Sequence, residues 1–374
     1  MEKSFDKLLS PLQFGPFKIK NRVMMAALTR MRGDPKLGLP KEHHFKYYSE
    51  RSEDAGVVLT ECIAVSSCGD CFKGALCAYN KDHKEGLTKL VEAVHKVGGI
   101  IFAQLFHCGR SSNKETLGVQ PVSCSDILNR SYKYDQPLAL SKDGVKDIIG
   151  KFKDAIQMCK DAGFDGVELH GANGYIIDQF LRDSTNTRTD EYGGSIENRS
   201  KFLLEIIDEA IKIYGNDRVG IKLSPTGRFN DMYDSNPKAL TEYLFDQLNK
   251  RKILFVEFMR PPDLFGKGLY EINGDEQYPE AAAMEGLKKQ LPNVLLIGNS
   301  NYSAEEAEKQ ISEGKIDMVS MGRNYMSNPD YCDRLKNGWE IDQPDYSSGW
   351  GGHCPELGPK GYSDFPKYKD KVKK

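Results

Sequence analysis

Eight short apolar segments, many of them rich in β-branched residues, recur along the chain with amphipathic segments between them. Most are continuous apolar runs, which is typical of strands that are buried on both faces. The eight segments are residues 23–28, 57–63, 99–107, 164–170, 218–224, 253–259, 293–299 and 316–322. Because eight such strands alternate with helices, the sequence predicts a (β/α)₈ TIM barrel of the α/β class.

The segments between the predicted strands carry apolar residues at the three- and four-residue spacing of a helix. The clearest of them are residues 84–99, 143–163, 195–215, 280–292, 303–315 and 328–338. Ser195 and Ser303 lie where helix N-caps are expected, and Gly163, Gly215 and Gly314 lie where C-caps are expected. These signals predict where the outer helices begin and end.

We expect residues 1–374 to form one domain. Residues 1–22 are predicted to form a small cap over the bottom of the barrel, and residues 108–142 an inserted loop after the third strand. Residues 338–374 form a polar tail rich in glycine and proline. A doubly wound sheet is the alternative fold. It usually carries a Gly-x-Gly-x-x-Gly loop after its first strand, and residues 23–33 have none.

The composition excludes several functional classes. The 52 basic and 54 acidic residues are mixed along the chain and give a net charge of −2, so we expect no nucleic-acid partner. No apolar run approaches the ~18 residues of a membrane span, and the N-terminus lacks the apolar core of a signal peptide. Nine cysteines favour free thiols in a reducing compartment. We therefore expect a soluble cytoplasmic protein.

Polar residues follow the predicted strands at their C-terminal ends, which is where TIM barrels place their active sites. They are Thr29, Glu61, Cys62, Gln104, His107, His170, Asn173, Tyr175, Lys222, Arg260, Gly298, Asn299, Gly322 and Arg323. The loops after strands seven and eight are the usual phosphate site of this fold. Gly298 and Gly322 would let backbone N–H groups approach a phosphate, and Arg323 would add a charged donor. Alternatively, the glycines serve only turns and Arg323 is a surface charge.

Two polar residues interrupt apolar strands, which is costly without a partner. The Gln104 amide and the Lys222 ammonium suit a polar heteroaromatic ring such as a reduced flavin. Alternatively, Lys222 extends to the barrel rim and Gln104 is hydrogen-bonded within the core. The cluster His170-x-x-Asn173-x-Tyr175 supplies two donors for a carbonyl oxygen and a phenol that can donate a proton. The structural alternative is that His170 ends the strand and Tyr175 packs on the rim.

Nearly the whole chain resembles the old yellow enzyme family of FMN-dependent ene reductases. The resemblance is carried by PLQFGPFKIKNRVMMAALTRMR (11–32), FAQLFHCGR (102–110), HGANGYIIDQFLRDSTNTRTDEYGGSIENRSKFLLEI (170–206), SMGRNYMSNPD (320–330) and KGYSDFPKY (360–368). It implies a barrel that binds FMN non-covalently at its mouth and is reduced by NAD(P)H. An α,β-unsaturated carbonyl compound would then take the hydride at its β-carbon.

The resemblance also implies roles for single residues. His170 and Asn173 fall on the pair that holds the substrate carbonyl oxygen, and Tyr175 falls on the donor of a proton to the α-carbon. The positions that match cofactor contacts are Ala27, Thr29, Gln104, Lys222, Gly298, Asn299, Gly322 and Arg323, with Cys62 near the flavin by position. Phe106 and Phe229 are expected to shape the substrate pocket. Three of these residues depart from the family pattern: Ala27 replaces a common proline, Lys222 replaces the usual arginine, and Phe106 replaces a common tryptophan.

Other functions stay open at this point. The protein could be an NAD(P)H oxidase or diaphorase that reduces quinones or oxygen, a flavin-binding protein without this chemistry, or a phosphosugar-type barrel enzyme without flavin. Cys62, Cys68, Cys71 and Cys77 cluster, and Cys68-Gly-Asp-Cys71 has zinc-like spacing, but we expect free or redox-sensitive thiols and no metal. His43 and His44 are expected on a solvated helix face. The predicted partner is a small enone or quinone, and the chain is expected to be a monomer or homodimer.

Overall fold

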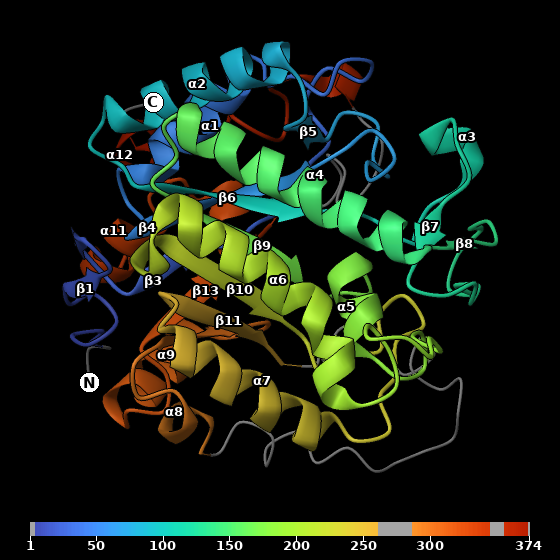
Figure 1. Cartoon of the computed structure of the whole chain (residues 1–374). Helices are drawn as coiled ribbons and strands as arrows, with labels where there is room; N and C mark the ends of the chain where they lie inside the picture. The colour runs from blue at the N-terminus through green and yellow to red at the C-terminus, as the bar shows by residue number, and fades with distance from the viewer. Residues whose placement is uncertain (1–3, 261–285, 345–354, 373–374) are drawn as a thin grey trace.

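The computed structural model describes residues 4–260, 286–344 and 355–372. Eight parallel strands form a closed barrel at its centre (Figure 1). In order around the barrel they are β3 (Val23–Met25), β4 (Val57–Ala64), β6 (Ile101–Phe106), β9 (Gly166–Gly171), β10 (Val219–Leu223), β11 (Phe255–Met259), β12 (Leu295–Asn299) and β13 (Met318–Met321). Because β3 pairs with both β4 and β13, no edge is left open. The predicted (β/α)₈ barrel is confirmed, and the doubly wound alternative is wrong.

Helices surround the barrel on its outside (Figure 1). In chain order they are α1 (Glu42–Ser52), α2 (Lys81–His95), α4 (Lys142–Asp161), α5 (Ile176–Leu181), α6 (Ile196–Tyr214), α7 (Pro237–Arg251), α8 (Leu287–Gln290), α9 (Ala304–Ser312), α10 (Arg323–Ser327), α11 (Tyr331–Asn337) and α12 (Tyr368–Lys371). Of the helix predicted over 280–292, residues 280–285 lie outside the described residues. Within the described ranges, no helix is long and apolar enough to cross a membrane.

The predicted helix caps are formed by local hydrogen bonds. The hydroxyls of Ser195 and Ser303 accept backbone N–H groups three residues further on, at 3.3 and 3.0 Å. Gly215 is the C-cap of α6 at φ +84°, and Gly163 and Gly314 directly follow the C-caps of α4 and α9 at φ +95° and +69°. Glycine adopts this left-handed conformation without the steric cost that a side chain would add.

The N-terminal segment closes the bottom of the barrel. It forms an antiparallel hairpin of β1 (Leu12–Phe14) and β2 (Phe17–Ile19). The Phe14 ring lies 5.5 Å from the rings of both Phe102 and Phe255, which lie in the first two residues of barrel strands β6 and β11. Gly220 leaves room for these rings, since a Cβ there would lie 2.2 Å from the ring of Phe255. The predicted cap therefore acts as an aromatic plug.

The insertion after the third barrel strand has a small structure of its own. It contains α3 (Lys114–Leu117) and a parallel pair of short strands, β7 (Val122–Ser123) and β8 (Leu138–Ala139). Figure 1 shows this segment projecting from one side of the barrel. A further short strand, β5 (Leu76–Cys77), pairs with the end of β4.

The expectation for the histidine pair is wrong. His44 is fully buried, and its Nε2 lies 3.5 Å from the carboxylate of Glu61. The half-buried His43 bonds the Arg32 carbonyl oxygen at 2.8 Å. Both rings contact Tyr362 of the C-terminal tail, which is itself fully buried. This long-range packing of the tail against α1 covers a face that the local sequence presents as polar. Of the rest of the tail, residues 345–354 lie outside the described residues.

Candidate active site

A layer of amide and ionisable side chains lies inside the C-terminal half of the barrel. Neighbouring strands place Gln104 beside Cys62 and Glu168, and Lys222 beside His170 and Glu257. Side chains in register on adjacent parallel strands point to the same side of the sheet. Gln104 Nε2 donates to Glu168 at 2.6 Å, and Lys222 Nζ donates to Glu257 at 3.2 Å. The amide and the cation predicted from the sequence are therefore brought together, and each has a buried carboxyl partner.

The two carboxyl groups of this layer interact directly. Burial raises the pKa of Glu168 well above its usual value, and the adjacent Glu257, which shares a hydrogen bond with it, raises that pKa further. The raised pKa favours the protonated form of Glu168, and the Lys222 ammonium pairs with the neighbouring Glu257. Glu168 and Glu257 were missed as site residues by the sequence analysis, although both interrupt apolar strands as Lys222 does.

A bulge in β4 turns Cys62 into the barrel. The register between β4 and β6 shifts between Leu59 and Cys62, so that β4 contains one extra residue there. Cys62 Sγ donates to Gln104 Oε1 at 3.0 Å, and its backbone N–H donates to Thr29 Oγ1 at 3.4 Å. Glu61 faces His44 on α1 instead. The structure thus joins Thr29, Cys62 and Gln104 and separates Glu61 from them.

His170 and Tyr175 lie together at the end of β9. Their ring centroids are 5.0 Å apart, and the Tyr175 ring also contacts Phe106 at 5.3 Å. Burial and the nearby Lys222 cation lower the pKa of His170 well below its usual value, so the imidazole is neutral. Its Nδ1 is buried without a hydrogen-bond partner among the described residues. Burial, and then the thiol of Cys71, raise the pKa of Tyr175 well above 10, so the phenol keeps its proton.

The turn that carries Asn173 is fixed through its backbone. Asn173 has a left-handed conformation (φ +59°), its N–H donates to Ser224 Oγ at 3.0 Å, and its carbonyl accepts from Asn230 Nδ2 at 2.8 Å. Gly174 follows at φ +72°, where a Cβ would lie 2.5 Å from Asn230 Cβ. Because both backbone groups of Asn173 are occupied, its side-chain amide is the group left for a ligand.

The loops predicted to hold a phosphate meet at the ends of β12 and β13. Arg323 Nη2 donates to the side chain of Asn301, and Asn299 Nδ2 donates to the Ser320 carbonyl at 3.4 Å. Ser300 and Asn301 both have positive φ, +79° and +53°. A Cβ at Gly298 would lie 2.8 Å from the Tyr302 ring. The last predicted strand-end residue, Arg260, pairs with Glu306 on α9 at 2.6 Å.

Aromatic side chains and thiols form the wall beside Tyr175. Phe106 packs against Phe72 with ring centroids 6.2 Å apart, in one cluster with Tyr175, Cys71 and Cys108. Phe229 contacts Tyr132 of the insertion at 6.2 Å. Cys71, Phe72 and Tyr132 were not predicted as site residues, because they lie on loops outside the strand pattern.

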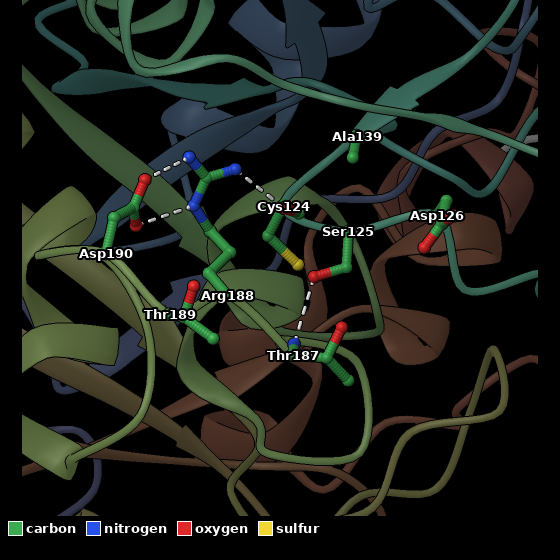
Figure 2. A pocket seen from close by; sticks show the side chains of 8 residues that line it. All are labelled: Cys124, Ser125, Asp126, Ala139, Thr187, Arg188, Thr189 and Asp190. Carbon is green, nitrogen blue, oxygen red and sulfur yellow. Dashed lines mark hydrogen bonds and ion pairs between the residues drawn. The ribbon is translucent and has the colours of Figure 1, made fainter.

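A recess of about 260 Å³ lies away from these residues, between the β7–β8 segment and the turn before α6 (Figure 2). Its most prominent group, Arg188, donates to both carboxylate oxygens of Asp190, at 3.0 and 2.6 Å. The same guanidinium donates to the Cys124 carbonyl at 2.8 Å. Since these donors are used within the protein, we assign no function to this recess.

Known proteins resemble this chain over nearly its whole length. The model of the NADH:flavin oxidoreductase / NADH oxidase family matches residues 7–342. A probable flavin mononucleotide-dependent alkene reductase from Leishmania infantum is 37% identical over 379 residues, 97% of this chain and 98% of the relative. The putative 12-oxophytodienoate reductase 3 from Oryza sativa subsp. japonica is 35% identical, covering 97% and 93%.

Solved structures give the same result. Morphinone reductase superposes with a TM-score of 0.88 at 33% identity, covering 99% of both chains. A morphinone reductase complex with tetrahydroNAD has a TM-score of 0.85 at 32% identity, covering 96% of this chain and 97% of that one. The old yellow enzyme from Trypanosoma cruzi has a TM-score of 0.87 at 30% identity, covering 97% of this chain and 99% of that one.

Proposed function

The chain belongs to the NADH:flavin oxidoreductase / NADH oxidase family and is an FMN-dependent NAD(P)H oxidoreductase, and from this premise we propose that it reduces the C=C bond of α,β-unsaturated carbonyl compounds. The observation that carries the proposal is the buried, protonated phenol of Tyr175 beside the neutral imidazole of His170. Electron transfer to a quinone or to oxygen needs neither a polarised carbonyl nor a proton donor placed in this way.

The residues of the barrel mouth fit FMN. Among the described residues, Glu257 is the one hydrogen-bond partner of Lys222 Nζ. An ammonium has three N–H donors, so Lys222 has donors left that could bind the pyrimidine end of the flavin. Thr29 and Gln104, which both contact Cys62, would complete the contacts to the ring. Gly298, Asn299, Gly322 and Arg323 would hold the phosphate. FMN held here would supply the chemistry of hydride transfer from NAD(P)H to the β-carbon of the substrate.

His170 and Asn173 hold the substrate carbonyl oxygen. A neutral imidazole donates one N–H, and the side-chain amide of Asn173 donates another from a turn fixed through its backbone. Negative charge builds on that oxygen as the β-carbon is reduced, and preorganised donors stabilise it in a site that excludes water. The two residues thereby lower the barrier at the carbonyl end of the conjugated system.

Tyr175 donates the proton that completes the reduction at the α-carbon. The O–H bond of Tyr175 breaks as a new C–H bond forms at the α-carbon. The C=C electron pair of the enolate makes this bond, and the C=O double bond re-forms in the saturated product. A phenol whose pKa lies above 10 keeps its proton until the enolate is present. Phe106 and Phe229 shape the pocket, with Phe72 and Tyr132 packed against them.

Replacing Tyr175 with phenylalanine tests this assignment. In an anaerobic cuvette the purified protein should show a flavin spectrum that NADPH bleaches and 2-cyclohexenone restores. We expect Tyr175→Phe to slow the enone step by roughly 10²–10⁴-fold and to leave bleaching by NADPH and reoxidation by a quinone unchanged. Tyr134→Phe, which alters a neighbouring phenol, is the matched control. Unchanged enone reduction in Tyr175→Phe would favour the diaphorase reaction instead.

A further inference from the structure

The thiol of Cys68, in the loop after β4, is surrounded by polar groups from three parts of the chain. Its sulfur lies 3.2 Å from Ser66 Oγ, 3.5 Å from His107 Nε2 and 3.8 Å from Lys151 Nζ. Ser66 belongs to the same loop, His107 follows β6, and Lys151 lies on α4. Cys68 is half-buried, so the sulfur remains accessible to a small molecule.

The proton of His107 is directed at this sulfur. The backbone N–H of Gly109 donates to His107 Nδ1 at 3.1 Å, and a backbone N–H can only donate, so Nδ1 carries no proton. Burial, together with the nearby Lys151 cation, lowers the pKa of His107 to about 3, so the ring is neutral. Its single proton is therefore on Nε2, the atom that faces Cys68.

Lys151 adds a positive charge at the same sulfur. Its side chain is 34% exposed and pairs with Asp147 one turn earlier on α4 at 2.7 Å. Burial alone would lower the pKa of Lys151, but Asp147 and the Cys68 sulfur raise it above its usual value, so the ammonium persists. A cation and hydrogen-bond donors around a partly exposed sulfur are the surroundings of reactive cysteines, since they stabilise the thiolate.

Cys71, three residues further along the same loop, provides a contrast within the molecule. It is also half-buried. Burial, contact with the thiol of Cys108 and the neighbouring Asp70 carboxylate raise the pKa of Cys71 well above its usual value. The sulfur of Cys68 thus lies beside a cation, whereas that of Cys71 lies beside a second thiol and a carboxylate. Among the described residues, no group of three or more cysteines, histidines and carboxylates is arranged to hold a metal.

We propose that Cys68 is a modification site for peroxides, separate from the carbonyl-binding residues at the barrel mouth. The thiolate attacks one peroxide oxygen, the S–O bond forms as the O–O bond breaks, and the leaving hydroxide takes a proton to become water. Cys68 is oxidised by two electrons to a sulfenic acid, and hydrogen peroxide is reduced to water. A peroxide is small enough for a half-buried sulfur, and the serine, histidine and lysine donors can bind its oxygens. The inference does not depend on which compound the flavin reduces.

Mass spectrometry of the intact holoenzyme tests the proposal. The protein is exposed to limiting hydrogen peroxide, sulfenic acids are trapped with dimedone, and each cysteine peptide is quantified. We expect Cys68 to be labelled at least tenfold faster than Cys71. Lys151→Met should slow labelling of Cys68 by roughly fivefold, while Lys151→Arg, which keeps the charge, should retain most of the rate.

Three results would overturn the proposal. Equal labelling of Cys68 and Cys71 would mean that exposure alone controls oxidation. An unchanged rate of Cys68 labelling in Lys151→Met would show that the Lys151 cation does not promote the reaction. Reaction of Cys68 with N-ethylmaleimide but not with peroxide would assign the site to carbon electrophiles. Because Lys151 lies partly in solvent on a helix surface, its replacement should preserve the fold, and the bound-flavin spectrum checks this.

Discussion

The N-terminal end of the barrel is filled by the rings of Phe14, Phe102 and Phe255, whereas the inward side chains at the C-terminal end are amide and ionisable groups. The rings pack into the space that Gly220 leaves, and they need no polar partner. At the other end, Lys222 and the carboxyl groups beside it are buried as well. The same eight strands therefore carry two cores with different chemistry.

This difference fits the proposal that the N-terminal end supplies stability and the C-terminal end supplies function. Apolar burial contributes about 25 cal/mol for each Å² removed from water, so the aromatic end stabilises the fold directly. A buried ion pair such as Lys222–Glu257 does not, because the desolvation of two charges offsets most of their attraction. We propose that the pair is retained at the mouth because Lys222 binds the flavin, and substitutions at the two ends should separate stability from binding.

The largest effect is expected when the cation at the mouth is removed. Lys222→Met leaves the Glu257 carboxylate buried beside Glu168 without its cation, which should lower the free energy of unfolding by about 3–5 kcal/mol. The same change should reduce retention of FMN. Urea denaturation and the flavin-to-protein absorbance ratio measure the two effects. Lys222→Arg is the matched control and should preserve both better; equal loss in the two variants would show that shape, not charge, matters here.

A smaller effect is expected when the aromatic end is overfilled. A Cβ at Gly220 would lie 2.2 Å from the Phe255 ring, so Gly220→Ala should lower the free energy of unfolding by about 1–3 kcal/mol. Flavin binding and turnover should change little, because the site lies at the other end of the strands. Gly150→Ala on α4 is the control, since its new Cβ meets no atom within 4 Å and should stabilise the helix by about 0.5–1 kcal/mol. A loss of turnover in Gly220→Ala would contradict the separation of the two ends.

The strands could be predicted from sequence because burial on both faces leaves a continuous apolar run. The run at 57–63 became β4 (Val57–Ala64), and a polar residue inside such a run, such as Gln104 or Lys222, pointed to the interior of the barrel. Glu168 carried the same signal. Its importance depends on which residues stand beside it in the neighbouring strands, and that register is not encoded in the run itself.

Loop positions and tail contacts could not be predicted in this way. Cys71 packs in the cluster of Phe106 and Tyr132 packs against Phe229 through loops whose path follows from contacts with distant segments. His44 looked solvated because its neighbours in sequence are charged, yet Tyr362 of the tail covers it. In each case the deciding contact joins residues far apart in the chain, and periodicity reports only on near neighbours.

The smallest and most selective effect concerns the pH dependence of stability. Two buried groups, His107 and Glu168, should change the free energy of unfolding with pH in opposite directions. His107 has a pKa of about 3 in the folded protein and about 6.5 when unfolded, so its contribution to stability is present above pH 6.5 and lost as the pH falls toward 3. Glu168 has a raised pKa in the folded protein, so its contribution is present below about pH 4.3 and lost as the pH rises.

Other buried groups titrate in the same range, so the measurement is a difference between the wild-type protein and a single variant. As the pH falls from about 6.5 to 5, the wild-type protein should lose part of its advantage in free energy of unfolding over His107→Gln. The loss should be up to about 1.4 kcal/mol per pH unit. The advantage over Glu168→Gln should grow over the same interval. Urea denaturation of the three proteins at several pH values gives both curves. Parallel curves for the wild-type protein and His107→Gln would mean that the folded protein accepts a proton on His107, and the N–H directed at Cys68 would then need another explanation.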